Sequence, residues 1–195
     1  MPSRLPIALI FATTMAGCHS PPRPEGDLPR PSNPELTRLF DADQAARSGP
    51  IEGVDFEALA LENSAQRTRV NALAADSLLW TAKDFYHAAM IFQHGPDSLA
   101  YERAHRWARR SEALDSSDAA ARWLVAAAWD RYQMSRGAPQ WFGTQTTRQG
   151  GVGPVLLYSL DTTQVTDAER VHRGVGTLLA LRARLDTINR RLGFP

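Results

Sequence analysis

The sequence predicts a mainly α-helical fold, built from antiparallel helical hairpins with one inserted β-hairpin flap. Three observations support this prediction. Helix-capping residues and apolar residues at helical spacing recur along most of the chain, and short glycine- and proline-containing turns separate the helical stretches. A single segment, residues 140–160, is rich in aromatic residues and threonine and breaks this rhythm. The length of 195 residues and a hydrophobic content of 43% fit one globular domain.

The first helix starts at an Asn-Pro-Glu sequence, residues 33–35, which supplies an N-cap, a proline at the first helical position and an early acidic residue. It is expected to run to about Arg47, where Ser-Gly-Pro, residues 48–50, ends it. A second helical stretch falls within residues 55–75, although Asn63 and the serine after it weaken its continuity.

Three further helices are expected between residues 81 and 139. Thr81 and Asp84 have the spacing of a capping box, and that helix ends at His-Gly-Pro, residues 94–96. Asp97 caps the next helix, and Ser116 or the serine after it starts the third. Because the connecting turns are short, the three helices are predicted to be antiparallel neighbours. The chain has no 34-residue self-similarity, so repeats are not predicted.

The segment 140–160 predicts two strands that turn near Gly150 and Gly151. An isolated hairpin is only marginally stable in water, so this one is expected to lie against the helices as a flap. A capping box at Thr166 then predicts one continuous helix to Leu192. The apolar stripe of this helix comprises Leu178, Leu181, Leu185 and Ile188. It is expected to pack within the same chain, although its spacing also suits a two-chain coiled coil.

Residues 1–17 have the features of a targeting segment: a positive charge at Arg4, a short apolar stretch and small residues before Cys18. The sequence Met-Ala-Gly-Cys that ends it resembles the bacterial lipoprotein signal, in which the cysteine is lipidated after cleavage. Methionine stands where leucine is usual. A plain secretory signal with an incidental cysteine is the alternative. Several acyl chains would give stable membrane attachment, where one alone would be marginal.

Residues 18–34 contain the expected lipidated Cys18 and a proline-rich stretch with almost no apolar residues, which predicts a semi-rigid tether. Residues 35–195 are expected to form the single helical domain. The residue after the cysteine is His19 and not an aspartate. A residue other than aspartate at this position resembles the pattern of outer-membrane lipoproteins that face the periplasm. The expected location is therefore the cell envelope.

Composition argues against several classes of function. The net charge is only +1, so phosphate-dominated binding of nucleic acid is not expected. One cysteine is too few for a disulfide framework or an iron–sulfur cluster.

His87 and His94 are two helical turns apart, too far to share a zinc ion, so neither a metal nor another cofactor is expected. At helical spacing the five tryptophans are expected to lie mostly in the core.

Residues 88–174 resemble a bacterial family of unknown function whose members are often secreted or lipid-anchored. The shared motifs are a Gln-His pair, an Asp-Arg pair, a Pro-Gln-x-aromatic-Gly-Thr-Gln loop, a later aspartate and an Arg-x-x-x-Gly sequence. The resemblance supplies candidate positions without an activity. It implies one polar cluster formed by Gln93, His94, Asp130, Arg131, Gln140, Gly143, Thr144, Gln145, Asp161 and Arg170.

Two interpretations of this cluster remain open. In the first, it is a hydrogen-bonded network that fastens the hairpin to the helices, because buried polar groups must be paired. In the second, an envelope hydrolase uses His94 as a general base oriented by Asp130, with Arg131 holding an anion and Thr144 or a water molecule as nucleophile. The first is favoured, because no recognised nucleophile motif or phosphate-binding loop accompanies the pair. The expected function is accordingly a lipid-anchored binding or scaffolding module with an envelope protein as its partner.

Overall fold

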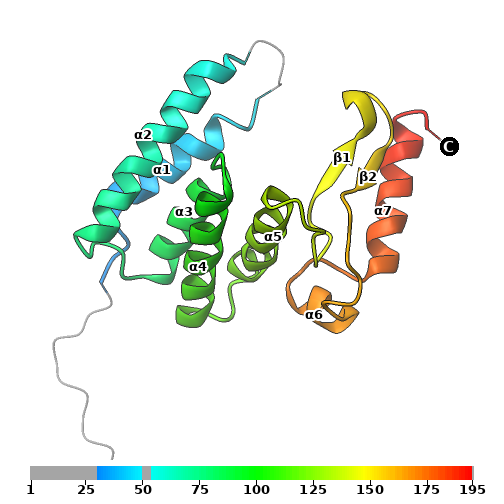
Figure 1. Ribbon diagram of the computed structural model, residues 1–195. Coiled ribbons are helices and arrows are strands. Elements are labelled where there is room, and N and C mark those ends of the chain that lie inside the picture. The colour runs from blue at the N-terminus through cyan, green and yellow to red at the C-terminus, as the bar shows by residue number, and fades with distance from the viewer. Residues whose placement is uncertain (1–29, 50–53, 195) are drawn as a thin grey trace, which may run out of the picture.

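The computed structural model describes residues 30–49 and 54–194. The predicted signal peptide, Cys18 and most of the predicted tether lie outside the described residues. The prediction of a mainly helical fold with one β-hairpin is confirmed. Figure 1 shows three groups of elements: a helical pair, a middle group of three helices, and the hairpin with two further helices. In chain order they are α1 (Pro34–Ala45), α2 (Phe56–Ala75), α3 (Ala82–Gln93), α4 (Ser98–Leu114), α5 (Ala119–Ser135), β1 (Thr146–Arg148), a 3-10 turn η1 (Gln149–Gly151), β2 (Val155–Leu157), α6 (Asp167–His172) and α7 (Leu178–Arg191).

The starts of α1 and α3 are joined through Asp84. This buried carboxylate completes the capping box with Thr81 and also accepts a hydrogen bond from the backbone N–H of Asn33 at 2.7 Å. Close by, the indole N–H of Trp80 donates to the carbonyl of Pro31 at 2.8 Å. The last residues of the predicted tether therefore contact the helical domain.

The middle layer of the protein is the antiparallel set α3, α4 and α5, as predicted (Figure 1). Buried alanines such as Ala104 and Ala108 let these helices approach closely. Phe92 and Trp107 pack edge to face with ring centroids 4.9 Å apart. Asp118, rather than Ser116 or Ser117, caps α5. The expectation that the tryptophans lie mostly in the core is met only in part: Trp107 packs against the core, Trp123 is exposed, and the other three are half-buried.

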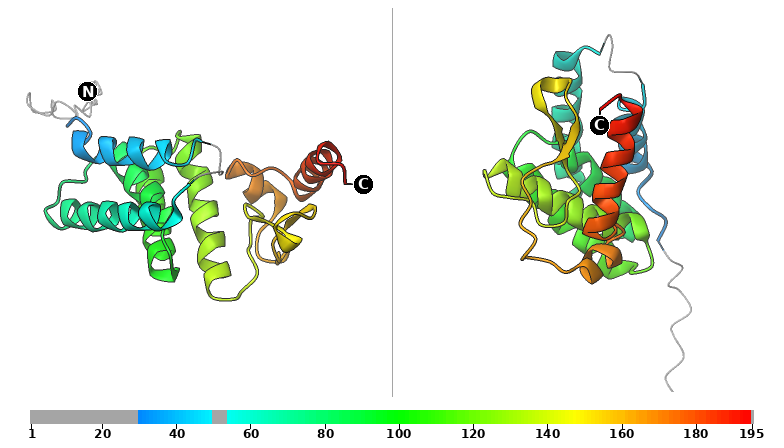
Figure 2. Two further views of the ribbon diagram at one scale, coloured as in Figure 1. Left: turned by 90° about the horizontal axis from the view of Figure 1, so that it is seen from above. Right: turned by 90° about the vertical axis from the view of Figure 1, so that its right-hand side faces the viewer.

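The hairpin turns where the glycine pair predicted it. Thr146 pairs with Leu157 and Arg148 with Val155, and both Gly150 and Gly151 have positive φ angles. However, the hairpin does not lie on α3–α5 as a flap: it pairs with α7, and Figure 2 shows the two side by side. Asn189 of α7 joins them, because its amide accepts from the N–H of Val155 at 2.7 Å and donates to the carbonyl of the same residue at 2.9 Å.

The predicted continuous helix from Thr166 to Leu192 is wrong: the chain forms α6 and α7 with a bend between them. Gly174 and Gly176 both have positive φ angles, which a continuing helix does not allow. The apolar stripe of α7 is half-buried against the hairpin rather than buried in the helical layer. Among the described residues, no helix is both long and apolar enough to cross a membrane.

Candidate functional site

Asp130, near the end of α5, organises the loop that follows this helix. Its side chain is completely buried and accepts five hydrogen bonds of 2.8–3.0 Å. Four come from the consecutive backbone N–H groups of residues 141–144, here called the Asp130 loop, and the fifth comes from the Thr144 hydroxyl. Both carboxylate oxygens are thus fully supplied with donors, which compensates the cost of burying the charge.

Arg170 on α6 holds the same loop from its carbonyl side. Its guanidinium, only 2% exposed, donates to the carbonyls of Trp141 at 3.0 Å and Phe142 at 3.2 Å. A further bond of 3.0 Å reaches the carbonyl of Val165. A buried carboxylate and a buried guanidinium therefore bind the opposite polar groups of one short loop, and through these hydrogen bonds the loop ties α5 to α6.

The remaining loop-motif residues have backbone roles. Gln140 is buried, and its amide donates to the carbonyls of Gln145 at 2.9 Å and Tyr158 at 3.0 Å while accepting from the Gln145 N–H at 2.9 Å. Its side chain thereby joins the two arms of the hairpin at their base. Gly143 has a φ of 90°, and a Cβ atom there would lie 3.0 Å from Cδ1 of Leu181, so only glycine fits without strain.

Arg131 extends the network toward α3. Its Nε donates to the Gln145 amide oxygen at 3.2 Å, and another guanidinium nitrogen donates to the backbone carbonyl of Gln93 at 3.0 Å. The Gln145 amide nitrogen donates in turn to the hydroxyl of Thr144 at 2.9 Å. The predicted cluster thus exists around Asp130, Arg131, Gln140, Gly143, Thr144, Gln145 and Arg170, with Gln93 contributing its main chain.

The expected pairing of His94 with Asp130 is wrong. Nδ1 of His94 lies 2.8 Å from Oδ2 of Asp43, on α1, while both oxygens of Asp130 are bound to its loop. Asp43 is 1% exposed and also accepts from Arg47 at 2.7 Å. Sequence reasoning missed Asp43, because its only local signal is an acid–base pair four residues apart on one helix, which is usual on exposed helix surfaces.

Asp161 also stands apart from the cluster. Its single contact with the cluster is through the backbone, because the N–H of Asp161 donates to the carbonyl of Gln140 at 2.9 Å. Its carboxylate accepts from the N–H and hydroxyl of Thr163, and these hydrogen bonds lower the pKa of Asp161. The side chain therefore stabilises a surface turn, which leaves it no part in a shared reaction site.

The described residues include no group of three histidine, cysteine, aspartate or glutamate side chains placed to hold a metal ion. His87 is instead stacked on Phe40, with parallel rings whose centroids lie 4.1 Å apart. Burial, and secondarily the positive charge of Lys83, lowers the pKa of His87 from 6.5 to about 4. This histidine is consequently neutral at pH 7.

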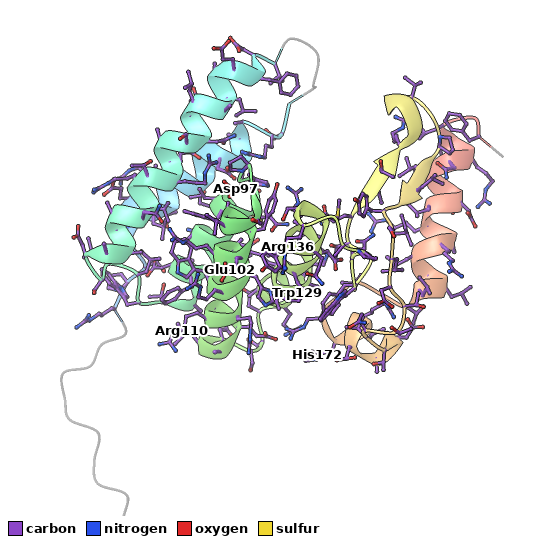
Figure 3. All side chains as sticks on the ribbon, in the orientation of Figure 1. Asp97, Glu102, Arg110, Trp129, Arg136 and His172 are labelled. Carbon is purple, nitrogen blue, oxygen red and sulfur yellow. The ribbon has the colours of Figure 1, made fainter. Side chains whose placement is uncertain are left out.

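Two neighbouring hollows open beside α4 and α5, and neither is a closed pocket. The first, of 540 Å³, lies over the network between the start of α4, α5 and the base of the hairpin; we call it the polar cleft, and Tyr101, Arg131, Gln145 and Tyr158 line it. The second, of 720 Å³, is a basic groove between α4 and α5 that contains Glu102, Arg110, Trp129 and Arg136 (Figure 3). Both hollows are open to a ligand, whereas the buried carboxylate of Asp130 is not.

Comparison with known proteins finds no match: neither a family model nor a curated protein nor a solved structure is significantly similar to this chain.

Proposed function

We propose that the chain is a lipid-anchored protein of the cell envelope that binds a partner protein through the face formed by α4 and α5. One observation carries the proposal. The groups that a hydrolase would have used are committed to holding the fold together, while the two hollows beside them are open. Asp130 accepts five hydrogen bonds, and the Thr144 hydroxyl donates one of them. Such an arrangement suits a rigid recognition surface better than bond cleavage.

The proposed anchor is Cys18, lipidated after removal of residues 1–17, with the proline-rich stretch as a tether. The residue after Cys18 is His19, which supports an outer-membrane location facing the periplasm. The resemblance to a bacterial family of unknown function stays a prediction. Most of the motif residues quoted for it lie around the Asp130 loop.

A hydrolase remains the second candidate, now with a different pair. The 2.8 Å contact between Asp43 and His94 fixes an imidazole, as an orienting carboxylate does for a general base. Among the described residues, however, no hydroxyl is hydrogen-bonded to His94. The pair also ties α1 to the end of α3, and this structural role accounts for its burial.

Site-specific photocrosslinking in intact cells tests the proposed function. A benzophenone amino acid replaces Ala113, at the basic groove, or Ser135, at the polar cleft; both residues are exposed. Ala183, exposed on α7, is the matched control position. We expect one protein adduct from the first two positions and none from the control. Adducts from Ala183 alone, or from no position, would contradict partner binding at this face.

A further inference from the structure

The basic groove carries an excess of positive charge between two helices. Three arginines of α4 and one at the end of α5 line it, and the only acid among its lining residues is Glu102. The four are Arg106, Arg109, Arg110 and Arg136. In Figure 3, Glu102 and Arg110 lie on α4, and Trp129 and Arg136 lie across from them on α5. The whole chain carries a net charge of only +1, so this concentration is a local feature.

Most of this charge is not neutralised within the protein. Arg106 lies 3.8 Å from Glu102, but both side chains are at least half exposed, and such pairs bind weakly. In the described part of the chain, the other three arginines form no salt bridge. Two of these three lie over aromatic rings instead: the guanidinium carbon of Arg136 is 5.2 Å from the centroid of the Tyr132 ring, and that of Arg110 is 5.8 Å from the centroid of the Phe85 ring on α3. The groove therefore presents cations that a ligand's carboxylates could pair with.

The arginines are spread along the groove rather than converging on one point. Arg106 and Arg110 are four residues apart on α4, a rise of about 6 Å. In an extended peptide, side chains two residues apart lie on one face with a spacing of about 6.6 Å. Carboxylates at every second position of such a peptide would match this spacing. A single phosphate would need its donors gathered around one centre.

The opposite wall of the groove is aromatic. The Trp129 ring lies 5.4 Å from the Tyr132 ring and 5.0 Å from the ring of His105, measured between centroids. Nδ1 of His105 is 3.0 Å from the carbonyl of Val125, and burial lowers the pKa of His105, so this side chain adds no charge at pH 7. The α4 wall of the groove is therefore mainly basic, and the α5 wall is mainly aromatic with Arg136 at its end. This corresponds to the two faces of an extended chain that alternates acidic and apolar residues.

We infer that the basic groove binds an extended acidic segment of the partner protein, with carboxylates on the α4 arginines and the intervening apolar side chains on the α5 aromatic rings. The inference rests on the proposed function and gives the chemistry of its partner. Recognition of this kind depends on salt, because the arginines are exposed and their interactions are screened by ions.

Fluorescence anisotropy with a defined peptide tests the inference. The probe is a fluorescein-labelled octapeptide of alternating glutamate and leucine, titrated with the full-length chain in a nonionic detergent. We expect saturable binding that weakens as salt rises. The double substitution Arg106→Ala/Arg110→Ala should weaken it at least about fivefold, from the loss of two exposed ion pairs. Arg190→Ala/Arg191→Ala, which removes the same charge from α7, should leave it unchanged.

Three results would overturn the inference. The first is equal binding of a peptide with glutamine in place of glutamate, and the second is an equal loss in the two double variants. The third is that the protein binds anionic phosphatidylglycerol vesicles and not the peptide, and that the α4 substitutions abolish this vesicle binding. The arginines would then face a membrane. Photocrosslinking from Ala113 separates this test from that of the proposed function. If the partner adduct persists in Arg106→Ala/Arg110→Ala, the inference about the groove is wrong while the proposed partner binding stands. If no adduct forms when both arginines are present, partner binding at this face is itself wrong.

Discussion

Oδ2 of Asp43 lies 2.8 Å from Nδ1 of His94, and this contact joins α1 to the end of α3 across 51 residues of sequence. Arg47 contacts the other carboxylate oxygen of Asp43 at 2.7 Å. The Gln44 amide also donates to the buried carboxylate, at 2.8 Å, so Asp43 has three side-chain partners. The consequences can be measured at each end of the contact.

Asp43→Ala should lower the free energy of unfolding by about 2 kcal/mol, because it leaves His94 and Arg47 without their shared carboxylate. Urea unfolding followed by circular dichroism measures the change. Asp41→Ala, an exposed position on the same helix, is the control and should change little. Equal stability of the two variants would show that the contact contributes nothing to the fold.

Asp130→Asn should destabilise the protein by about 3 kcal/mol, because an amide nitrogen would face backbone N–H groups that now donate to a carboxylate oxygen. The same unfolding measurement detects it. Asp161→Asn changes an equivalent side chain in a surface turn and should have a much smaller effect. A variant Asp130→Asn that unfolds like the unsubstituted protein would refute the role assigned to the Asp130 loop.

Asn189→Ala should loosen α7 from the hairpin, because both hydrogen bonds to Val155 are lost, at a cost of about 1–2 kcal/mol. Limited proteolysis followed by mass spectrometry should show faster cleavage in the hairpin turn. Cleavage within α3–α5 should be unaffected. Thr187→Ala, exposed on the same helix, serves as the control. Unchanged cleavage of the hairpin in Asn189→Ala would contradict this contact's importance.

Stability should fall as the pH is lowered from 6.5 to 4, because the pKa of His87 is about 4 in the folded protein and near 6.5 when the chain is unfolded. In this window the unfolded chain binds a proton that the folded protein does not, so acid favours unfolding. The contribution is fully present above pH 6.5 and reaches a loss of about 3 kcal/mol at pH 4. His87→Phe should flatten this dependence in melting experiments, whereas His172→Phe, at an exposed position, should not.

Cys18→Ala should abolish incorporation of labelled palmitate and leave an unprocessed precursor. Metabolic labelling followed by immunoprecipitation measures both effects. Normal labelling of the variant would refute the proposed anchor. The substitution Cys18→Ser is a second test, since it keeps the size of the side chain but removes the thiol that would carry the lipid.

Local signals predicted most helix starts correctly, because a cap is complete within a few residues of sequence. Thr81 with Asp84 and Thr166 with Glu169 both form the capping boxes expected of them. The end of the helix after Thr166 was missed, because the apolar spacing continues across Gly174 and Gly176 while the backbone turns there. Helical periodicity describes one face of a segment and does not register a bend within it.

The candidate site was predicted in part for a similar reason. The separate motifs of the family that residues 88–174 resemble implied that Asp130, Gln140, Gly143 and Arg170 lie together, and the structure places them around one loop. The partner of His94 depends on a contact between helices that are distant in sequence, and no local pattern specifies it. Composition likewise gave no indication of the basic groove, because its four arginines are balanced by acids elsewhere in the chain.

The double attachment of the Asp130 loop sets an order in which its contacts can form as the chain is synthesised from its N-terminus. The helices α3, α4 and α5 precede the loop and can pack first, with Asp130 ready to receive its N–H groups. The loop carbonyls remain without their guanidinium until α6 has emerged, because Arg170 follows them by nearly 30 residues. Until Arg170 has been synthesised, the loop is held by Asp130 alone, so its attachment from both sides is completed late in the synthesis of the chain.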